Sequence, residues 1–315
     1  MQSLQELVTH TRTEMAKGIV GQKELVDHLI IVLLCSGHAL IEGVPGIAKT
    51  LTVKLLGSIL QIDTQRVQCT SDLMPADVIG SNVFNTNTAS FTLHKGPLFT
   101  DLLLADEINR MPPRTQAALL EAMEERQITV DGVRYPLSEF FTVLATQNPV
   151  EFEGTYPLPE AQLDRFLLKI NVTYPEIDEE LAILERHHQG FDAKKIDAIQ
   201  VVPLSADLLR QARVEVNGVK VEPALFKYLL EVVRKSRTWP SLLLGASPRA
   251  AVSLMQVSKA TAAMDGRDYL IPDDVKDAAG PVLRHRLLLK PEAELESIDT
   301  DSVIKDILAS VEVPK

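Results

Sequence analysis

The sequence predicts an α/β protein in which a largely parallel sheet, covered by helices on both faces, is followed by a smaller all-helical domain. In the first half of the chain, short apolar runs alternate with helical patterns, and in the second half the patterns are almost entirely helical. A hydrophobic content of 45% is typical of a chain that builds a packed core. The 315 residues leave room for about two domains of roughly 150 residues each. We therefore expect one domain over 1–174 and a second over 175–315.

The first half reads as helix and strand in alternation. Apolar residues at helical spacing predict a helix over Gln22–Ser36, which ends at Gly37. The short apolar run His38–Ile41 follows and predicts a buried strand. Further strands are expected at Arg66–Thr70, Asp101–Ala105, Phe140–Thr146 and Phe166–Val172. Strands separated by helices favour parallel pairing.

Two segments interrupt this alternation and predict β-hairpins. Residues Gln127–Tyr135 alternate across Asp131-Gly132, a pair typical of a type I′ turn because glycine tolerates positive φ. Residues Ser81–Leu93 have the same character around a polar Asn/Thr tip. Spacing alone is compatible with surface decoration or with a functional role.

The second half contains five helical patterns separated by breaks with Pro or Gly. These predicted helices are Glu179–His188, Ala206–Val214, Glu222–Arg237, Ser247–Met264 and Pro272–Leu287. The change of pattern after Tyr174 places the expected domain boundary.

Composition narrows the classes of partner and compartment. Lys and Arg number 32 against 43 Asp and Glu, a net charge of −11, and aromatic residues make up 5%. This balance disfavours nucleic acid and anionic membranes as partners. The two cysteines, Cys35 and Cys69, form no ligand-like pair, which favours a reducing, cytoplasmic location. No run of about 18 uncharged apolar residues predicts a transmembrane helix.

The segment Gly43–Thr50 lies between a predicted strand and a predicted helix, the context of a phosphate-binding loop. Glycines allow backbone N–H groups to turn toward phosphate oxygens at a helix N-terminus. In such a loop, Lys49 reaches the β- and γ-phosphates and the Thr50 hydroxyl ligates Mg²⁺. Ala48 departs from the common pattern, which has glycine before the lysine. Alone, the segment is also compatible with an ordinary turn into a helix.

The expected strand that starts at Asp101 is followed by adjacent carboxylates, Asp106 and Glu107. A carboxylate at a strand end can hold Mg²⁺ or its water, the Walker B role of P-loop nucleotidases, and Asp106 fits it. Glu107 would then face and polarise an attacking water. Two acids after an apolar run are also common as a solvated strand end, so the phosphate loop upstream strengthens this interpretation.

Another predicted strand ends in the amide of Asn148, before Pro149. Asn148 would orient the attacking water between Glu107 and the γ-phosphate. An Asn-Pro turn is the alternative if the segment is read alone.

In this order, these residues resemble the AAA+ ATPases and, more closely, their MoxR family. The similar segments are Ile19–Gln22, Gly43–Thr50, Leu104–Arg110, Ala145–Pro149, Leu158–Phe166 and Gly245–Arg249. They extend over most of the chain, from about residue 19 to 290. Ala48 suits that family, in which alanine before the lysine is usual.

The resemblance implies a P-loop αβα nucleotide-binding domain followed by a helical lid, with ATP between them and Mg²⁺ held by Thr50 and Asp106. It implies that Val20 and Gly21 contact adenine and that both hairpins are inserts of this class. The phosphate-binding residues that it implies are Gly43, Val44, Pro45, Gly46, Ile47, Ala48, Lys49 and Thr50.

The resemblance also gives roles to two arginines. Arg165 resembles an arginine finger presented to the ATP of a neighbouring subunit, and a surface ion pair with a nearby acid is the alternative. Arg249 resembles the sensor 2 arginine, which reaches from the lid to the γ-phosphate of its own subunit. Whether Arg110 or Arg114 also crosses a subunit boundary stays open. The three glutamates 121, 124 and 125 are expected on the solvated face of a helix.

Together these features predict Mg²⁺-dependent hydrolysis of ATP to ADP and phosphate. The family implies a ring, a homohexamer by analogy, that acts as a chaperone-like remodeller or activator of other proteins. A von Willebrand factor A-domain protein or another client is the implied partner. The alternatives are a magnesium-chelatase-like subunit, a nucleic-acid-associated motor, or a nucleotide-gated scaffold without useful hydrolysis.

Overall fold

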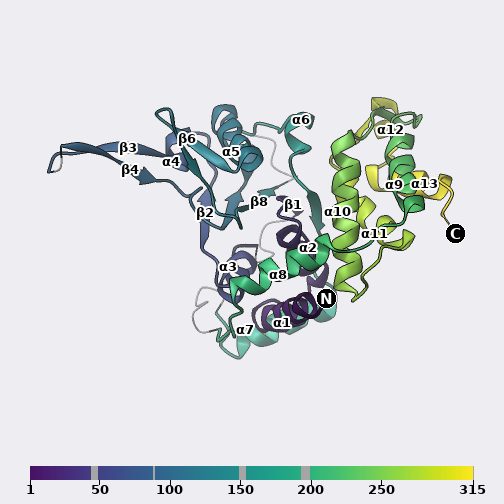
Figure 1. Cartoon of the computed structure of the whole chain (residues 1–315), viewed down its shortest axis with the longest axis horizontal. Coiled ribbons are helices and arrows are strands. Elements are labelled where there is room, and N and C mark those ends of the chain that lie inside the picture. The colour runs from purple at the N-terminus through teal and green to yellow at the C-terminus, as the bar shows by residue number, and fades with distance from the viewer. Residues whose placement is uncertain (44–48, 88, 149–153, 193–198, 315) are drawn as a thin grey trace.

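The structure is a computed structural model and describes residues 1–43, 49–87, 89–148, 154–192 and 199–314. Its centre is a five-stranded sheet in which every neighbouring pair is parallel, in the order β2-β5-β8-β1-β9 (Figure 1). The strands are β1 (Ala39–Gly43), β2 (Thr64–Gln68), β5 (Leu102–Asp106), β8 (Thr142–Gln147) and β9 (Leu168–Val172). All five predicted strands are confirmed, and so is their parallel pairing.

Helices cover both faces of this sheet because its inner strands β1, β5 and β8 are largely apolar and buried on both sides. On β1, Ala39 and Ile41 face one core cluster, while Leu40 faces the other. Helices α1 (Gln2–Gly18), α2 (Lys23–Leu34) and α3 (Lys49–Leu60) contribute to the first cluster, and α5 (Pro113–Glu125) contributes to the second. The short helices α4 (Pro75–Ile79), η1 (Ile108–Arg110) and α6 (Glu160–Leu163) lie in the connections between strands.

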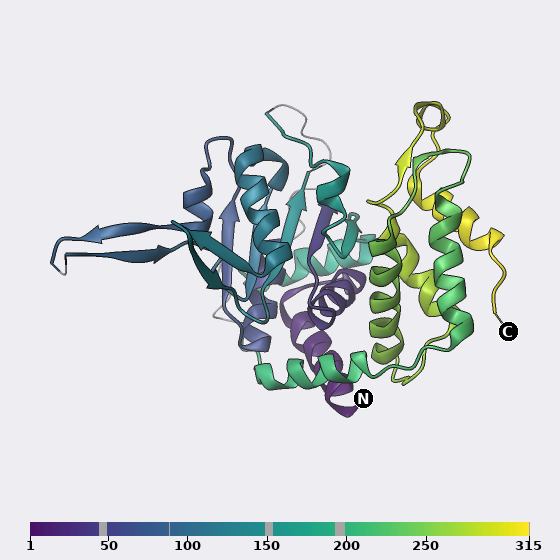
Figure 2. The same ribbon diagram turned by 45° about the horizontal axis from the view of Figure 1, so that its top comes forward.

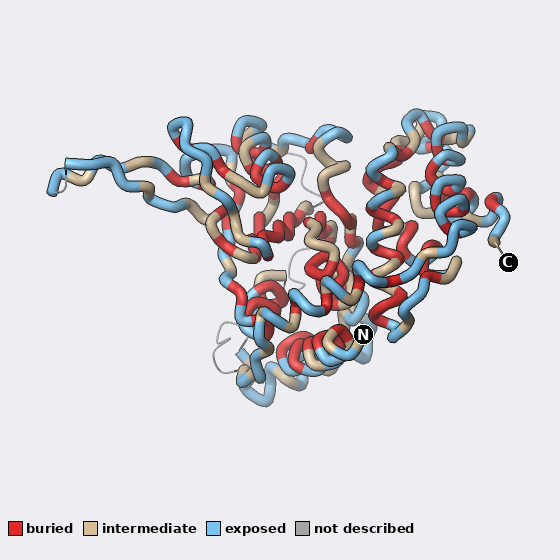
Figure 3. The backbone as a smooth tube through the Cα atoms, in the orientation of Figure 1, coloured by how far each residue is buried: buried red, intermediate tan, exposed pale blue. Residues whose placement is uncertain are grey.

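Both predicted hairpins are confirmed. Strands β6 (Gln127–Val130) and β7 (Val133–Pro136) are antiparallel, and φ is +49° at Asp131 and +80° at Gly132, as a type I′ turn requires. Strands β3 (Gly80–Asn85) and β4 (Ser90–Lys95) form a hairpin that projects far from the body of the molecule (Figures 1 and 2). This hairpin is largely exposed (Figure 3).

The second half is mainly helical, as predicted. Its expected helices are α7 (Ile177–His188), α8 (Ala206–Asn217), α9 (Pro223–Ser236), α10 (Pro248–Met264) and α11 (Pro272–Leu283). A small sheet of β10 (Leu242–Leu244) and β11 (Leu288–Leu289), with α12 (Pro291–Leu295) and α13 (Thr300–Ser310), was not predicted. Within the described ranges, no helix is both long and apolar enough to cross a membrane.

The helix α8 packs on the first helix of the chain before the lid begins. The Glu215 carboxylate accepts a hydrogen bond of 2.9 Å from the Leu4 backbone N–H and pairs with the amino terminus. Helices α9 to α11 then pack together, and α10 and α11 lie against α2 and β9 within one continuous core cluster. The boundary between 1–174 and 175–315 stays a prediction, and part of the segment after it is attached to the first domain.

Candidate nucleotide-binding and hydrolysis site

The residues proposed to bind phosphate, metal and the attacking water gather, where the structure describes them, at the ends of the parallel strands. Gly43 ends β1, Asp106 ends β5, and Asn148 follows β8, which lies between those two strands. Neighbouring strands are about 4.8 Å apart, so the ends of β1 and β5 lie roughly 10 Å apart. This carboxyl edge therefore brings the three segments to within the size of a nucleotide triphosphate, as predicted.

Lys49 begins α3 directly beside the end of β1. Its Nζ donates a hydrogen bond of 2.8 Å to the Gly43 carbonyl. Burial lowers the pKa of Lys49, and this shift is partly offset by the carboxylates of Asp106, Glu107 and Glu42. The next residue, Thr50, is half-buried in the first turn of the helix. Five predicted loop residues lie outside the described residues: Val44, Pro45, Gly46, Ile47 and Ala48.

Thr146, on β8, connects the two adjacent carboxylate residues. Its hydroxyl donates a hydrogen bond of 2.6 Å to Asp106 Oδ1 and accepts one of 2.9 Å from the Glu107 N–H. Glu107 has φ +60° and ψ +54°, a left-handed conformation that is uncommon outside glycine. Such a conformation persists only where its surroundings hold it, and the Thr146 hydroxyl supplies one such contact. No functional role was predicted for Thr146.

The outward side of the same edge is lined by β2. Arg66 Nη2 lies 2.7 Å from Asp106 Oδ2, and Gln68 Nε2 donates a hydrogen bond of 3.2 Å to Glu107 Oε2. Arg110 Nη1 also lies 3.2 Å from Glu107 Oε2. Arg66 and Gln68 were missed because only the order of the strands shows that β2 is next to β5.

The donor set at this edge fits Mg²⁺. The Thr50 hydroxyl and the Asp106 carboxylate are hard oxygen ligands, which this ion prefers. Asn148 is half-buried and follows β8, the strand that lies between β1 and β5. Among the described residues, no group of three or more His, Cys, Asp and Glu side chains is arranged to hold a metal ion. An ion that arrives with phosphate oxygens needs few protein ligands.

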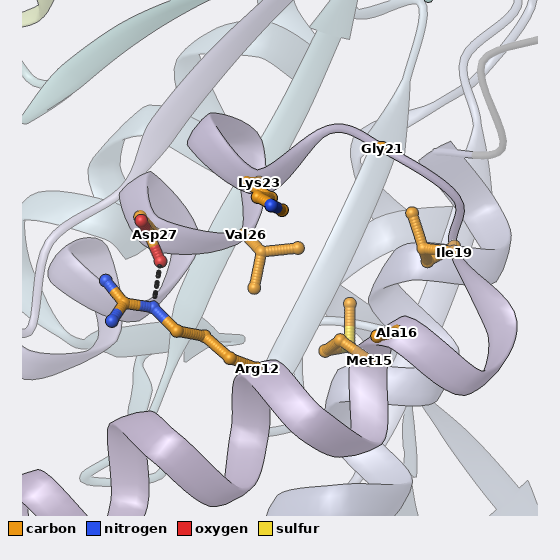
Figure 4. Close-up of a pocket in the computed structure, with 8 residues that line it drawn as sticks. All are labelled: Arg12, Met15, Ala16, Ile19, Gly21, Lys23, Val26 and Asp27. Carbon is orange, nitrogen blue, oxygen red and sulfur yellow. Dashed lines mark hydrogen bonds and ion pairs between the residues drawn. The ribbon is translucent and has the colours of Figure 1, made fainter. Parts of the chain in front are cut away.

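The predicted adenine contact lies in the turn between α1 and α2. Gly21 has φ +67°, and a β-carbon there would overlap the Glu179 carboxyl group, so the position requires glycine. A cavity of about 390 Å³ lies beside this turn (Figure 4). It is lined by Arg12, Met15, Ala16, Ile19, Gly21, Lys23, Val26 and Asp27. Val20 belongs to the same turn but does not line the cavity.

The two predicted arginines lie together, on one glutamate. Arg165 Nη2 is 2.9 Å from Glu124 Oε2, and Arg249 Nη2 is 2.9 Å from Glu124 Oε1. Met123, the residue before Glu124, accepts a hydrogen bond of 3.2 Å from His38, which directly precedes β1. This cluster therefore lies at the amino edge of the sheet, at the opposite end of β1 from Lys49.

This cluster bears on the expectations for Arg249 and Glu124. The expected role of Arg249 at the γ-phosphate of its own subunit stays a prediction, and in this structure the length of β1, about 13 Å or more, separates its partner Glu124 from the carboxyl edge. The reason is the docking of α10, because Ser247 Oγ donates to Asp164 Oδ2 at 3.0 Å beside the Arg165 segment. Glu124 is exposed on its helix, as expected, and both of its carboxylate oxygens are ion-paired.

The sheet is parallel, a lysine follows β1, carboxylates lie at the end of β5, an amide follows β8, and a helical lid follows the sheet. This combination defines a P-loop ATPase of the AAA+ class. Comparison with known proteins agrees. The model of the ATPase family associated with various cellular activities (AAA) matches residues 38–168, and that of the AAA lid domain matches residues 234–307.

Individual relatives match over nearly the whole chain. The uncharacterized protein YeaC of Bacillus subtilis is 43% identical over 94% of this chain and 91% of its own length. The chaperone MoxR1 of Mycobacterium tuberculosis is 41% identical over 96% of this chain and 81% of its own. The crystal structure of a protein from Cytophaga hutchinsonii, assigned as an ATPase, is 42% identical with a TM-score of 0.90, covering 99% of this chain and 96% of that one. The chain belongs to the MoxR family of AAA+ ATPases.

Proposed function

We propose that this protein hydrolyses ATP to ADP and phosphate with Mg²⁺ and that it does so as a ring, a homohexamer by analogy with the class. The observation that carries the proposal is the arrangement at the carboxyl edge. There the Thr146 hydroxyl on β8 joins Asp106 to the Glu107 backbone, and the neighbouring strand β1 ends at Gly43, whose carbonyl accepts a hydrogen bond from Lys49. A scaffold that only bound nucleotide would have no use for a second carboxylate held in a left-handed turn.

Each side chain at this edge has a role in the reaction. Lys49 neutralises phosphate charge, and Thr50 and Asp106 would hold Mg²⁺, which withdraws electron density from the phosphate oxygens when it is bound. Glu107 accepts a hydrogen bond from the attacking water, and Asn148 orients that water in line with the bond that breaks. The water oxygen bonds to the γ-phosphorus while the bond between that phosphorus and the bridging oxygen breaks, one proton of the water passes to Glu107, and ADP and phosphate leave.

Positive charge for the transition state is proposed to come from a second copy of the chain. Arg165 and Arg249 lie at the amino edge, away from their own Lys49, so we assign both to the nucleotide of a neighbouring subunit. An arginine supplied across an interface can raise turnover about 10³-fold or more. An isolated subunit is therefore nearly idle.

Phosphate release measured against protein concentration tests this function. Specific activity should rise steeply as subunits assemble, and a flat dependence for a sample shown to be monomeric would refute the supply of arginines by a neighbour. Glu107→Gln should bind ATP and scarcely cleave it, and turnover near that of the wild type would remove Glu107 from its role. DNA should not be required for turnover, which separates this function from that of a nucleic-acid motor.

For the cellular role, we propose a chaperone-like remodeller or activator of other proteins, in line with the chaperone MoxR1 among its relatives. A protein with a von Willebrand factor A domain is the first client to test. Glu107→Gln held with ATP should retain such a client in an affinity pulldown, whereas Lys49→Ala should not. Equal recovery of the client with both variants would show that binding does not depend on the nucleotide.

A further inference from the structure

Glu124 has no part in the site described so far, yet it is ion-paired with both arginines. Its two carboxylate oxygens are each 2.9 Å from one guanidinium nitrogen, on Arg165 and on Arg249. We propose that Glu124 is a positioning residue that holds Arg165 and Arg249 as a pair, aimed at the nucleotide phosphate of a neighbouring copy. This inference rests on the proposed function and adds a residue to its machinery.

The backbones next to both arginines are already fixed by one buried cluster. Arg286, whose side chain is 2% exposed, donates from Nε to Asp164 Oδ1 at 2.7 Å and from Nη2 to the Phe166 carbonyl at 2.7 Å. These two contacts hold the residues on either side of Arg165. Ser247, the N-cap residue of α10, bonds to the same Asp164 and so fixes the start of the helix that carries Arg249.

Among the described residues, the ion pairs with Glu124 are the contacts that orient these two side chains. The Arg165 side chain is 29% exposed and that of Arg249 is 50% exposed. In the part of the chain that the structure describes, Glu124 is the one carboxylate that pairs with either of them. A long arginine side chain loses much rotamer freedom when it is held, so a fixed partner prepares it for binding.

Charge explains why a carboxylate is needed at this place. The guanidinium groups of Arg165 and Arg249 repel each other because both lie against Glu124. The single negative charge of Glu124 between them offsets that repulsion. Glu124 leaves one positive charge in excess, which an incoming phosphate can neutralise. Each guanidinium has five N–H donors, so it can keep its contact with Glu124 while it donates to phosphate oxygens.

Kinetics of Glu124 variants test the proposal directly. Glu124→Ala should lower kcat by between about 10- and 100-fold, because misplaced groups cost rate, and should leave KM for ATP unchanged, because Lys49 lies at the other edge. Glu124→Asp keeps the charge and should recover part of the loss. Glu121→Ala removes a carboxylate one turn earlier on the same helix and should have no effect. A kcat within twofold of wild type for Glu124→Ala would overturn the proposal.

A mixing experiment separates this role from a purely structural one. Glu124→Ala and Lys49→Ala subunits are mixed, and co-purification of tagged with untagged chains confirms mixed rings. In these rings, a Lys49→Ala subunit offers an intact pair of arginines to the nucleotide of a Glu124→Ala subunit, so activity should exceed the sum of the two variants. The same mixture with Arg165→Ala tests the proposed function itself. If ATP hydrolysis recovers in the mixture with Arg165→Ala but not in the mixture with Glu124→Ala, only the proposed role of Glu124 is overturned. If hydrolysis recovers in neither mixture, the supply of arginines across the interface is refuted.

Discussion

The carboxyl edge of the sheet gathers polar and acidic side chains around Lys49, whereas the amino edge holds two arginines on a single glutamate. Both edges are built on the same strands, since β1 begins beside His38 and ends beside Lys49. One edge has the groups proposed to bind a triphosphate and to activate water. The other edge has an excess of positive charge and lies away from the proposed phosphate site of its own chain. This difference is the basis of our proposal that two copies of the chain together complete one site.

The largest expected effect is the loss of turnover on removal of Arg165 from the amino edge. Arg165→Ala should lower turnover in the assembled ring about 10³-fold or more, because the transition-state charge loses its partner, while nucleotide binding is retained. Phosphate release and binding of a fluorescent ATP analogue would be measured side by side. Arg234→Ala, which removes an exposed arginine in the last turn of α9, should behave as wild type. Equal turnover for the two variants would show that the amino edge has no part in hydrolysis.

The second prediction concerns the stability of the amino edge in acid. His38 is buried, its Nδ1 accepts from the Val143 N–H, and its Nε2 donates to the Met123 carbonyl beside Glu124. Burial, with a smaller contribution from Arg126, lowers the pKa of His38 to about 4. The unfolded chain therefore binds a proton near pH 6.5 that the folded chain refuses until about pH 4, so folding stability falls as pH falls through that window.

For His38 alone, this loss amounts to about 3 kcal/mol once the pH is below the lower pKa. Urea unfolding midpoints at several pH values between 7 and 4 would measure it. His38→Gln offers an acceptor and a donor to the same two backbone groups without titrating, so its dependence on pH should be shallower. The same slope for the variant and the wild type would assign the acid sensitivity to another group, such as buried His285, whose pKa burial also lowers.

A smaller effect on kcat is expected from the loss of the Thr146 hydroxyl at the carboxyl edge. Thr146→Val removes the hydroxyl that joins Asp106 to the Glu107 backbone, and hydrogen bonds to charged groups are worth about 1.5–3 kcal/mol. We therefore expect kcat to fall between about 10- and 100-fold with KM for ATP little changed. Thr146→Ser retains the hydroxyl and should recover most of the rate. Steady-state kinetics would contradict the role of Thr146 if the valine and serine variants were alike.

The smallest effect concerns the ion pair between Arg66 and Asp106. Arg66 competes with a metal for the Asp106 carboxylate, and exposed ion pairs are worth up to about 1 kcal/mol. Arg66→Ala should therefore lower the Mg²⁺ concentration for half-maximal ATP hydrolysis by up to about fivefold, and Arg66→Lys should fall between it and the wild type. A higher Mg²⁺ requirement in Arg66→Ala would mean that this arginine assists the metal or the phosphates.

Most elements of this fold, though not β10, β11, α12 and α13, were predictable from the sequence, and so was the local part of the candidate site. Apolar runs predicted the five strands, and Asp131-Gly132 predicted a hairpin with positive φ at both residues. The motifs after β1 and at the end of β5 predicted that Lys49, Asp106 and Glu107 belong to the site. These signals are local, because periodicity, turn chemistry and strand ends depend on residues that are close in sequence.

Tertiary structure alone decided which distant residues share an edge. Gln68 reaches Glu107 because β2 is the neighbour of β5, and Glu124 reaches Arg249 because the lid docks through Asp164 and Arg286. Strand order and lid docking are set by the whole packed core, and a charged side chain on a helix carries no local mark of the partner it meets. For that physical reason, motifs predicted where a nucleotide would bind, and only the folded chain showed that Arg165 and Arg249 lie at the opposite edge of the sheet.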